Sequence, residues 1–260
     1  MPWPPLRCRT GIALDLGSAR TRAWLSGHGT ILDVPTVGLP GDGAVHPIRH
    51  GVIVDTPATA RMIDRLLRHR LPRHGSRLIV LTTPVLGGID FRAEARTALE
   101  TLRPHTVLTV PSARAVAAAI GADLARPLLV VDIGAHVTEA VLLTEGGVTD
   151  ARRAMIGTSG PDRPTPAAQV ADAVTDMVTL MLEQDRTSQT LDALDRGVLL
   201  AGGGPLRPDI THRLTRQLHR GVQPVPAPHT AAVRGAAVLL ESARRHPSTA
   251  AATASPKRRP

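Results

Sequence analysis

Residues 128–143 read LLVVDIGAHVTEAVLL, and this stretch decides the fold class. An apolar run ends at Asp132-Ile133-Gly134, and a second apolar run follows a short turn, which predicts a buried strand and its hairpin partner. Earlier in the chain, GIALDLGSARTRAWL (11–25) repeats the arrangement with Asp15-Leu16-Gly17-Ser18 at the turn. Helical patterns alternate with strands around both motifs. We therefore predict an α/β fold that is built from two related halves.

A third glycine-rich turn, Ala201-Gly202-Gly203-Gly204, follows the apolar strand of GVLLAGGG (197–204). Glycine lets the backbone approach a phosphate closely, and the N–H groups of such a turn can cradle it. Any one of these motifs alone would more often be an ordinary tight turn. The occurrence of two aspartate-glycine turns, each after an apolar strand, is stronger evidence for a phosphate-binding site. The candidate binding residues are Asp15, Gly17, Ser18, Asp132, Gly134, Gly202, Gly203 and Gly204, with Asp15 and Asp132 as the pair that would hold the waters around Mg²⁺.

The composition is that of a globular protein, because hydrophobic residues make up 42% of the 260 residues and charged residues only 20%. Lys257 is the only lysine, which excludes a GK[ST] phosphate loop and a Schiff base within the fold. Cys8 is the only cysteine, which excludes internal disulfides and cysteine-cluster metal sites. No stretch is apolar over the roughly 20 residues that a bilayer span needs. We expect a cytoplasmic protein without a secretory signal.

The net charge of +9 comes almost entirely from arginine. Nucleic-acid binding would favour a concentrated basic surface interleaved with aromatic residues. The arginines instead spread along the whole chain, and tyrosine is absent. We therefore expect no nucleic-acid partner.

The remaining pattern predicts an ordered series of short elements. Thr56 is predicted as the N-cap of a helix that has Pro57 in its first turn. The segment PGDGAVHPIRHG (40–51) is predicted to be a loop, and SGPDRPTP (159–166) a linker. Further strands are predicted at 31–35, 77–84, 106–111 and 221–225, and further helices at 90–102, 113–124, 170–181, 205–220 and 229–243.

The three motifs together resemble those of the superfamily of actins, heat-shock chaperones and sugar kinases. GIALDLGSARTRAWL is similar to its first phosphate motif, LLVVDIGAHVTEAVLL to its second, and GVLLAGGGPL to its adenosine motif. RHGVIVD (49–55), AVAAAIGADL (115–124) and AAVRGAAVLLE (231–241) resemble connecting segments of the rod-shape-determining branch, the MreB/Mbl-like bacterial actins. The resemblance covers roughly residues 10–160 and 166–243.

The resemblance implies an actin-like (ribonuclease H-like) duplicated core that binds ATP or ADP with Mg²⁺. It divides the chain into a leader (1–10), a first core subdomain (11–126) on which the helix at 229–243 packs back, a second core subdomain (127–228) and a disordered tail (245–260). The family inserts one outer subdomain in each half, and only short segments stand at those places here. We expect both outer subdomains, which wall the nucleotide cleft, to be missing.

Two departures from the family pattern bear on catalysis. Arg114 stands where the resemblance places the glutamate that polarises the attacking water, and arginine stays protonated at neutral pH. In the second phosphate loop Ala135, His136 and Val137 replace two glycines and a threonine. His136 is either a phosphate ligand or an ordinary loop histidine, and the second interpretation is the simpler.

The resemblance thus implies a cytoskeletal scaffold for cell shape or envelope morphogenesis with weak or absent ATP hydrolysis. The alternative is a working, polymerising ATPase in which another residue replaces the lost glutamate. Its partners would be itself or a longer bacterial actin, and cell-wall synthesis proteins. A basic segment around Leu71 (Arg68, Arg70, Arg73 and Arg77) suggests contact with an anionic membrane at the inner face, although a solvated turn explains it equally well.

Overall fold

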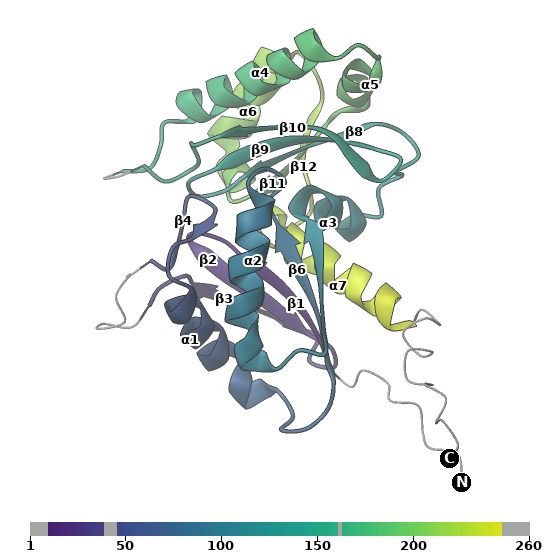
Figure 1. The fold of residues 1–260 in the computed structure, drawn as a ribbon. Helices are drawn as coiled ribbons and strands as arrows, with labels where there is room; N and C mark the ends of the chain where they lie inside the picture. Colours follow the sequence, from purple (N-terminus) through teal and green to yellow (C-terminus); the bar gives the residue numbers. More distant parts are fainter. Residues whose placement is uncertain (1–9, 39–45, 161–162, 246–260) are drawn as a thin grey trace.

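The computed structural model describes residues 10–38, 46–160 and 163–245. Two five-stranded sheets form its framework, one in each half of the molecule (Figure 1). The first sheet has the order β3-β2-β1-β6-β7, from β1 (Thr10–Leu16), β2 (Arg20–Leu25), β3 (Ile31–Pro35), β6 (Arg77–Thr83) and β7 (Thr106–Pro111). The second has the order β10-β9-β8-β11-β12, from β8 (Leu128–Ile133), β9 (Thr138–Thr144), β10 (Gly147–Ala154), β11 (Val198–Gly202) and β12 (Val222–Pro224).

The two sheets share one topology. In each, three strands form an antiparallel meander, a fourth strand pairs in parallel with the first of the three, and a fifth pairs in parallel with the fourth. This repetition confirms the prediction of an α/β core made of two related halves. The connections from β3 to β4 and from β10 to α4 are short, spanning residues 36–47 and 155–166.

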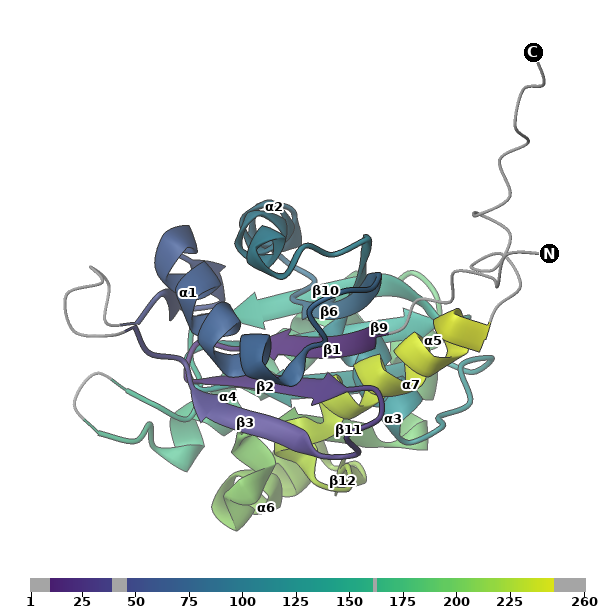
Figure 2. The same cartoon turned by 90° about the horizontal axis from the view of Figure 1, so that it is seen from below.

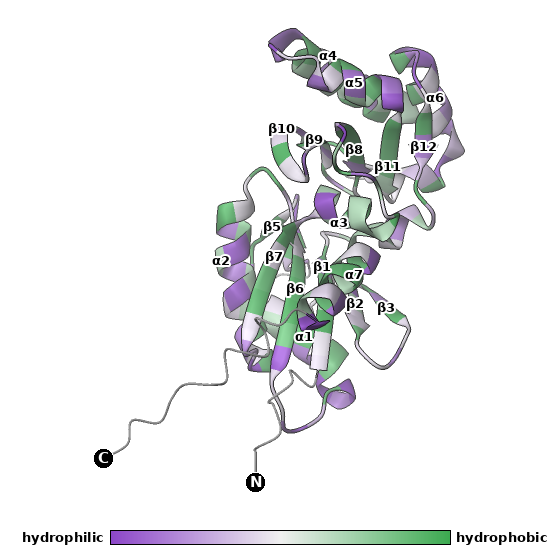
Figure 3. Ribbon diagram, turned by 90° about the vertical axis from the view of Figure 1, so that its right-hand side faces the viewer, coloured by the Kyte–Doolittle hydropathy of each residue, from purple (hydrophilic) through white to green (hydrophobic). Residues whose placement is uncertain are grey.

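Helices cover the outer faces of both sheets. On the first sheet lie α1 (Thr56–Leu67) and α2 (Gly88–Leu99), and on the second α4 (Ala167–Gln184), α5 (Gln189–Arg196) and α6 (Pro208–Leu218). The apolar stripe predicted for α4 is buried, as Val170, Val174, Met177 and Met181 show. Strands such as β6 and β11 are mostly hydrophobic along their length, whereas helices such as α2 alternate between hydrophobic and polar positions (Figure 3).

Helices α3 (Ser112–Ala119) and α7 (Ala231–Arg245) lie between the two sheets (Figure 1). Figure 2 shows α7 running along the face of the first sheet opposite to α1 and α2. The two helices touch through small residues: a Cβ added to Gly235 of α7 would lie 1.6 Å from the carbonyl oxygen of Ala115 in α3. The halves are therefore joined through a close helix contact that only glycine permits.

Several local predictions were wrong. The N-cap of α1 is Asp55, not Thr56, because the Asp55 carboxylate accepts the N–H of Ala58 at 2.8 Å. The helix predicted at 113–124 ends at Ala119, since Gly121 turns the chain with a φ of 61°. The predicted loop at 40–51 contains β4 (Ile48–Arg49), which pairs with β5 (Val52–Ile53). Strand β10 and helix α5 were not predicted.

Four single-turn 3-10 helices complete the described elements: η1 (Arg68–Arg70), η2 (Glu100–Leu102), η3 (Gly204–Leu206) and η4 (Pro228–Thr230). The predicted leader and tail fall almost entirely outside the described residues, since β1 begins at Thr10 and α7 ends at Arg245. Among the helices of the described ranges, none has the length and apolar character that a bilayer crossing requires.

Candidate functional site

A cavity of about 420 Å³ lies between the two halves, where the three glycine-rich turns meet. Seven of the eight predicted binding residues line it: Asp15, Gly17, Ser18, Asp132, Gly134, Gly202 and Gly203. Gly204 is buried outside this lining, and Arg114 is exposed on α3, also outside it. The structure therefore brings the sequence motifs together but leaves the arginine at the expected glutamate position away from the cavity wall.

The two aspartate-glycine turns have the same geometry. The N–H of Gly17 donates to the carbonyl of Arg20 at 3.1 Å, and the N–H of Gly134 donates to that of Val137 at 2.9 Å. A Cβ on either glycine would lie within 2.9 Å of the same carbonyl oxygen. The turns themselves therefore require these glycines, and a phosphate would have to be held by amides further along each turn.

The third turn contains three glycines with different roles. Gly202 has a φ of 82°, and its Cβ would lie 2.4 Å from a carboxylate oxygen of Asp132. Gly204 packs against the side chain of Ile133, with its Cβ position 2.4 Å from the Ile133 Cβ. Gly203 has open space on its Cβ side and lines the cavity. Only Gly203 therefore leaves room beside the backbone for a ligand.

Three charged side chains lie in a row across the first sheet, next to the turn that joins β1 to β2. Asp15 in β1 stands opposite Arg22 in β2, and Arg22 stands opposite Asp33 in β3. Directly opposed residues of antiparallel strands project from the same face. An Arg22 Nη atom lies 3.7 Å from an Asp15 carboxylate oxygen, and the Arg22 Nε donates to Asp33 at 3.2 Å. We call this row the first charge row.

A second charge row crosses the second sheet at the equivalent place. Asp132 in β8 stands opposite Glu139 in β9, and Glu139 stands opposite Arg153 in β10. Glu139 is buried and forms an ion pair with Arg153 at 3.0 Å. All six side chains of the two rows line the cavity. With Arg20, the described residues of the lining supply four carboxylates and three guanidinium groups.

The crowding of carboxylates perturbs their ionisation. Burial raises the pKa of Asp132 to about 7, the charges of Asp15 and Glu139 add to this, and Arg22 opposes it. Burial also raises the pKa of Asp15, against the opposing charge of Arg22 and a 2.7 Å hydrogen bond from Thr82. About half of the Asp132 carboxyl groups are therefore protonated at neutral pH unless a cation binds beside them.

Glu139 also ties the two halves together. Its carboxylate accepts the backbone N–H groups of Val85 and Leu86, at 3.1 and 3.2 Å, and both belong to the connection between β6 and α2 in the first half. Neither Glu139 nor Arg22 is among the site residues that the sequence motifs predict. The hairpin register would have found both, because a turn closed by Gly134 and Val137 sets Asp132 opposite Glu139, and the turn after Asp15 sets Arg22 opposite it.

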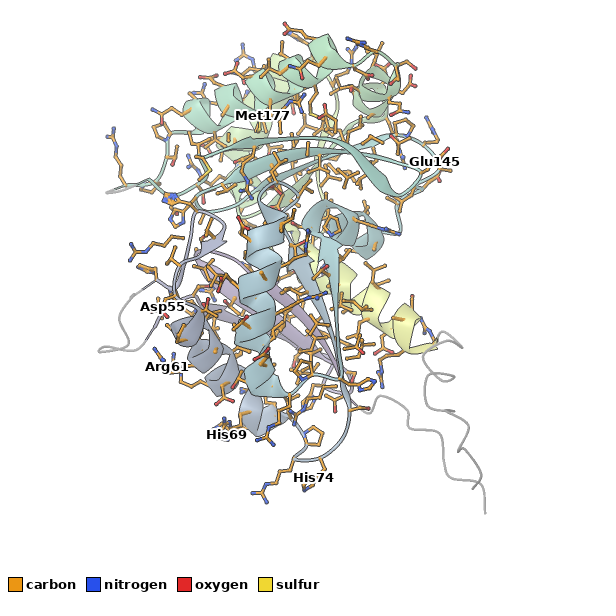
Figure 4. All side chains as sticks on the ribbon, in the orientation of Figure 1. Asp55, Arg61, His69, His74, Glu145 and Met177 are labelled. Carbon is orange, nitrogen blue, oxygen red and sulfur yellow. The ribbon has the colours of Figure 1, made fainter. Side chains whose placement is uncertain are left out.

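His136 lies at the rim of the cavity and stacks on His50, with ring centroids 5.1 Å apart and an angle of 12° between the planes. Burial and the nearby His50 and His46 lower the pKa of His136. No cluster of three or more potential metal ligands occurs among the described residues. His69 and His74 lie at the end of the first half far from the second (Figure 4).

Three of the four arginines in the basic segment around Leu71 make contacts within the protein. Arg68 pairs with Asp64 at 2.8 Å, Arg70 donates to the carbonyl of Leu66 at 2.9 Å, and Arg77 donates to those of Leu102 and Pro72. Arg68, Arg73 and Arg77 line a separate surface cavity of about 300 Å³. The segment is therefore a structured turn as well as a basic one.

Comparison with known proteins gives a consistent set of matches. A family model described as MreB/Mbl protein matches residues 43–163. The cell shape-determining protein MreB of Escherichia coli (strain K12) is 24% identical over 178 residues, with 56% of this chain and 51% of the relative covered. The chain thus spans about half the length of the curated relatives that it matches.

Solved structures share the fold. The structure of MreB5 of Spiroplasma citri bound to ADP matches with a TM-score of 0.79 and 16% identity, covering 92% of this chain and 98% of that one. A MamK double helical filament matches with a TM-score of 0.68 and 14% identity, covering 89% and 98%. The matches confirm the resemblance to actin-like, MreB-type proteins that the motifs predicted.

Proposed function

We propose that this actin-like, MreB-type chain is a cytoplasmic scaffold protein of bacterial cell shape or envelope morphogenesis, whose central cavity binds ATP or ADP weakly and hydrolyses ATP slowly or not at all. The MreB relatives support the cell-shape role, and the ADP-bound MreB5 structure supports nucleotide as the ligand. We propose residues 11–126 with 229–243, and residues 127–228, as the two lobes that would hold the nucleotide.

The observation that carries the proposal is the lining of the cavity. Three glycine-rich turns converge on it, as a nucleotide site needs, yet the guanidinium groups of its described lining do not outnumber its carboxylates. A cavity without excess positive charge attracts a polyanion only weakly. We therefore expect dissociation constants of roughly 10–1000 μM, about −7 to −4 kcal/mol. On α3, Arg114 supplies no general base, and its side chain lies outside the cavity lining.

The alternative, a working ATPase, is favoured by one observation. Asp132 lines the cavity and its pKa is raised to about 7, which suits a general base at neutral pH. Glu139 is less suited to that role, because its oxygens already accept hydrogen bonds from Val85, Leu86 and Arg153. Measurable phosphate release that is abolished in Asp132→Asn would favour the ATPase over the inactive scaffold.

The direct test of the nucleotide site is equilibrium binding of fluorescent ATP and ADP to the wild type and to Gly203→Leu. An added Cβ at Gly203 meets no protein atom within 4 Å, and Gly203 lines the cavity, so we expect the leucine to obstruct nucleotide binding while the fold is kept. Gly221→Leu is the matched control, because Gly221 also has open space beside it but lies outside the cavity lining. Absence of wild-type binding up to millimolar nucleotide would defeat the nucleotide proposal.

We further propose self-association, or association with a longer bacterial actin, supported by the filament of the MamK relative. Cell-wall synthesis proteins are the proposed downstream partners. The basic segment is proposed to contact anionic lipid, each arginine contributing about 1 kcal/mol. Arg73 is the residue to change, since Arg68, Arg70 and Arg77 make the internal contacts given above. Vesicle co-sedimentation that ignores lipid charge, or is equal for Arg73→Glu, would contradict the membrane proposal.

A further inference from the structure

The surface cavity of about 300 Å³ beside the basic segment has a strongly positive lining. Its charged residues are four arginines and one aspartate, namely Arg68, Arg73, Arg77, Arg103 and Asp64. Four guanidinium groups and one carboxylate give the lining a net charge of +3. The Asp64 carboxylate accepts the Nε of Arg68 at 2.8 Å and the hydroxyl of Thr101 at 3.3 Å. Of the four arginines, therefore, only Arg68 is neutralised by an ion pair among the described residues.

Arg77 holds the two walls of this cavity together. One wall is the turn after η1, and the other is formed by the end of η2 and Arg103. The Arg77 guanidinium donates to the carbonyl of Pro72 in the first wall at 2.8 Å and to that of Leu102 in the second. Both acceptors are neutral carbonyls, so these contacts fix the side chain without cancelling its charge. The cavity thus has a fixed positive group in its lining.

Arg103 occupies a backbone position that ordinarily suits glycine. Its φ is 48°, in the left-handed region, and its N–H donates to the carbonyl of Glu100 at 2.8 Å, which ends η2. A side chain is disfavoured in this conformation, and glycine is the usual residue at such a cap. The Arg103 side chain is exposed and lines the cavity, and among the described residues it makes neither an ion pair nor a hydrogen bond. Its donors are therefore free for a ligand.

The chemistry that fits this lining is a phosphate group with two negative charges. A guanidinium fork binds the oxygens of a phosphate through paired N–H donors, and a phosphomonoester carries about two charges near pH 7. A volume of about 300 Å³ lies at the lower end of small-molecule sites, so it suits a phosphate on a small attached group. In the central cavity, by contrast, each guanidinium group of the described lining is paired with a carboxylate.

We propose that this arginine-lined cavity binds a phosphomonoester group, carried either by a lipid head group or by a free phosphorylated molecule. The inference goes beyond the lipid contact proposed above, which needs only a basic surface, because a cavity with placed donors distinguishes a phosphomonoester from other anions. No described residue lines both this cavity and the central one. The inference and the nucleotide function can therefore fail independently.

Isothermal titration calorimetry with glycerol phosphate tests the cavity directly. The wild type should bind, and Arg73→Ala and Arg103→Gly should each weaken binding by roughly 5- to 20-fold, because each removes one charged donor. Glycine suits the φ of 48°, so Arg103→Gly should keep the fold. Arg65→Ala is the matched control, since Arg65 is an exposed arginine of α1 outside the lining, and it should bind as the wild type does.

Co-sedimentation with vesicles identifies the source of the phosphate group. Phosphatidylcholine vesicles with phosphatidic acid present a phosphomonoester, whereas those with phosphatidylglycerol, at matched surface charge, present a phosphodiester. Retention that favours phosphatidic acid by about threefold or more, and loses this preference in Arg103→Gly, would assign the group to a lipid whether or not glycerol phosphate binds. Binding of glycerol phosphate without a head-group preference would assign it to a free molecule.

Three results would overturn the proposal. The first is a wild type that neither binds glycerol phosphate nor prefers phosphatidic acid. The second is binding that Arg73→Ala and Arg103→Gly leave unchanged. The third is an equal loss in Arg65→Ala, which would show that the overall charge of this region, and not the arginine-lined cavity, attracts the anion.

Discussion

Replacing Gly235 by alanine should force the two halves of the molecule apart. The added Cβ would lie 1.6 Å from the carbonyl oxygen of Ala115 and 2.4 Å from its carbonyl carbon. Both atoms belong to the backbone of α3, so no side-chain rotation can relieve the overlap. An ordinary contact between carbon and carbonyl oxygen is about 3.3 Å or longer, so α3 and α7 would have to separate by roughly 1.7 Å.

The expected cost follows from two opposing effects. Alanine is favoured over glycine within a helix by about 1 kcal/mol. Overpacking a buried contact costs about 1–3 kcal/mol, and more where the backbone must move. Separating the helices would also loosen the apolar clusters on both sides of them, which include Val116 and Val233. We expect a net loss of about 3 kcal/mol in the free energy of unfolding.

Thermal unfolding followed by circular dichroism measures this loss. In a chain of this size 1 kcal/mol corresponds to about 2–4 °C, so the midpoint should fall by roughly 6–12 °C. Gly88→Ala is the control, because Gly88 is also a buried helical glycine but its Cβ would meet only the flexible end of Arg92, at 3.1 Å. A midpoint for Gly235→Ala at or above that of the wild type would refute the packing described for α3 and α7.

Three further predictions concern the cavity. The folded-state pKa of Asp132 is about 7, above its ordinary value of 3.8, so this group stabilises the fold below about pH 4 and loses that contribution as the pH rises to 7. The unfolding free energy of the wild type relative to Asp132→Asn should therefore fall by up to about 1.4 kcal/mol per pH unit between pH 5 and 7. A difference that does not change with pH would exclude the raised pKa. Glu139→Gln should cost about 2 kcal/mol in urea unfolding, because it weakens the charged hydrogen bonds from Val85 and Leu86, and an unchanged midpoint would show that the carboxylate is not needed there. Gly202→Ala should lower the thermal midpoint by several degrees through its positive φ and its contact with Asp132, and an unchanged midpoint would argue against the tight turn.

The parts of the fold that the sequence predicts are those with a clear apolar period. The buried strands β1, β6 and β8 and the helix α4 follow directly from such patterns. Strand β10 was missed because it lies at the edge of its sheet, and its residues, GVTDARRA, are half-exposed and largely polar. An edge strand has one open side, so its sequence lacks the continuous apolar run that marks a central strand.

Motifs along one strand predicted the part of the candidate site that turn chemistry identifies, whereas the part that sheet register determines also needs the pairing of the strands. The aspartate-glycine motifs located the turns, and seven of the eight predicted residues line the cavity. The expectation that Arg114 occupies a catalytic position came from the family resemblance. Its side chain is exposed and does not line the cavity. Arg22 and Glu139 acquire their positions from pairing across strands, which a motif read along one strand does not show.

The placement of α7 has a consequence for how the protein folds during synthesis. The face of the first sheet that includes Ala13, Leu78 and Val80 is covered by Val233 and Leu240, which are translated about 150 residues or more later. Until the ribosome has released residues 231–245, that apolar face lacks the cover that α7 provides, and contacts so distant in sequence form slowly. The nascent first half is therefore the stage at which this protein is most exposed to aggregation and most in need of a chaperone.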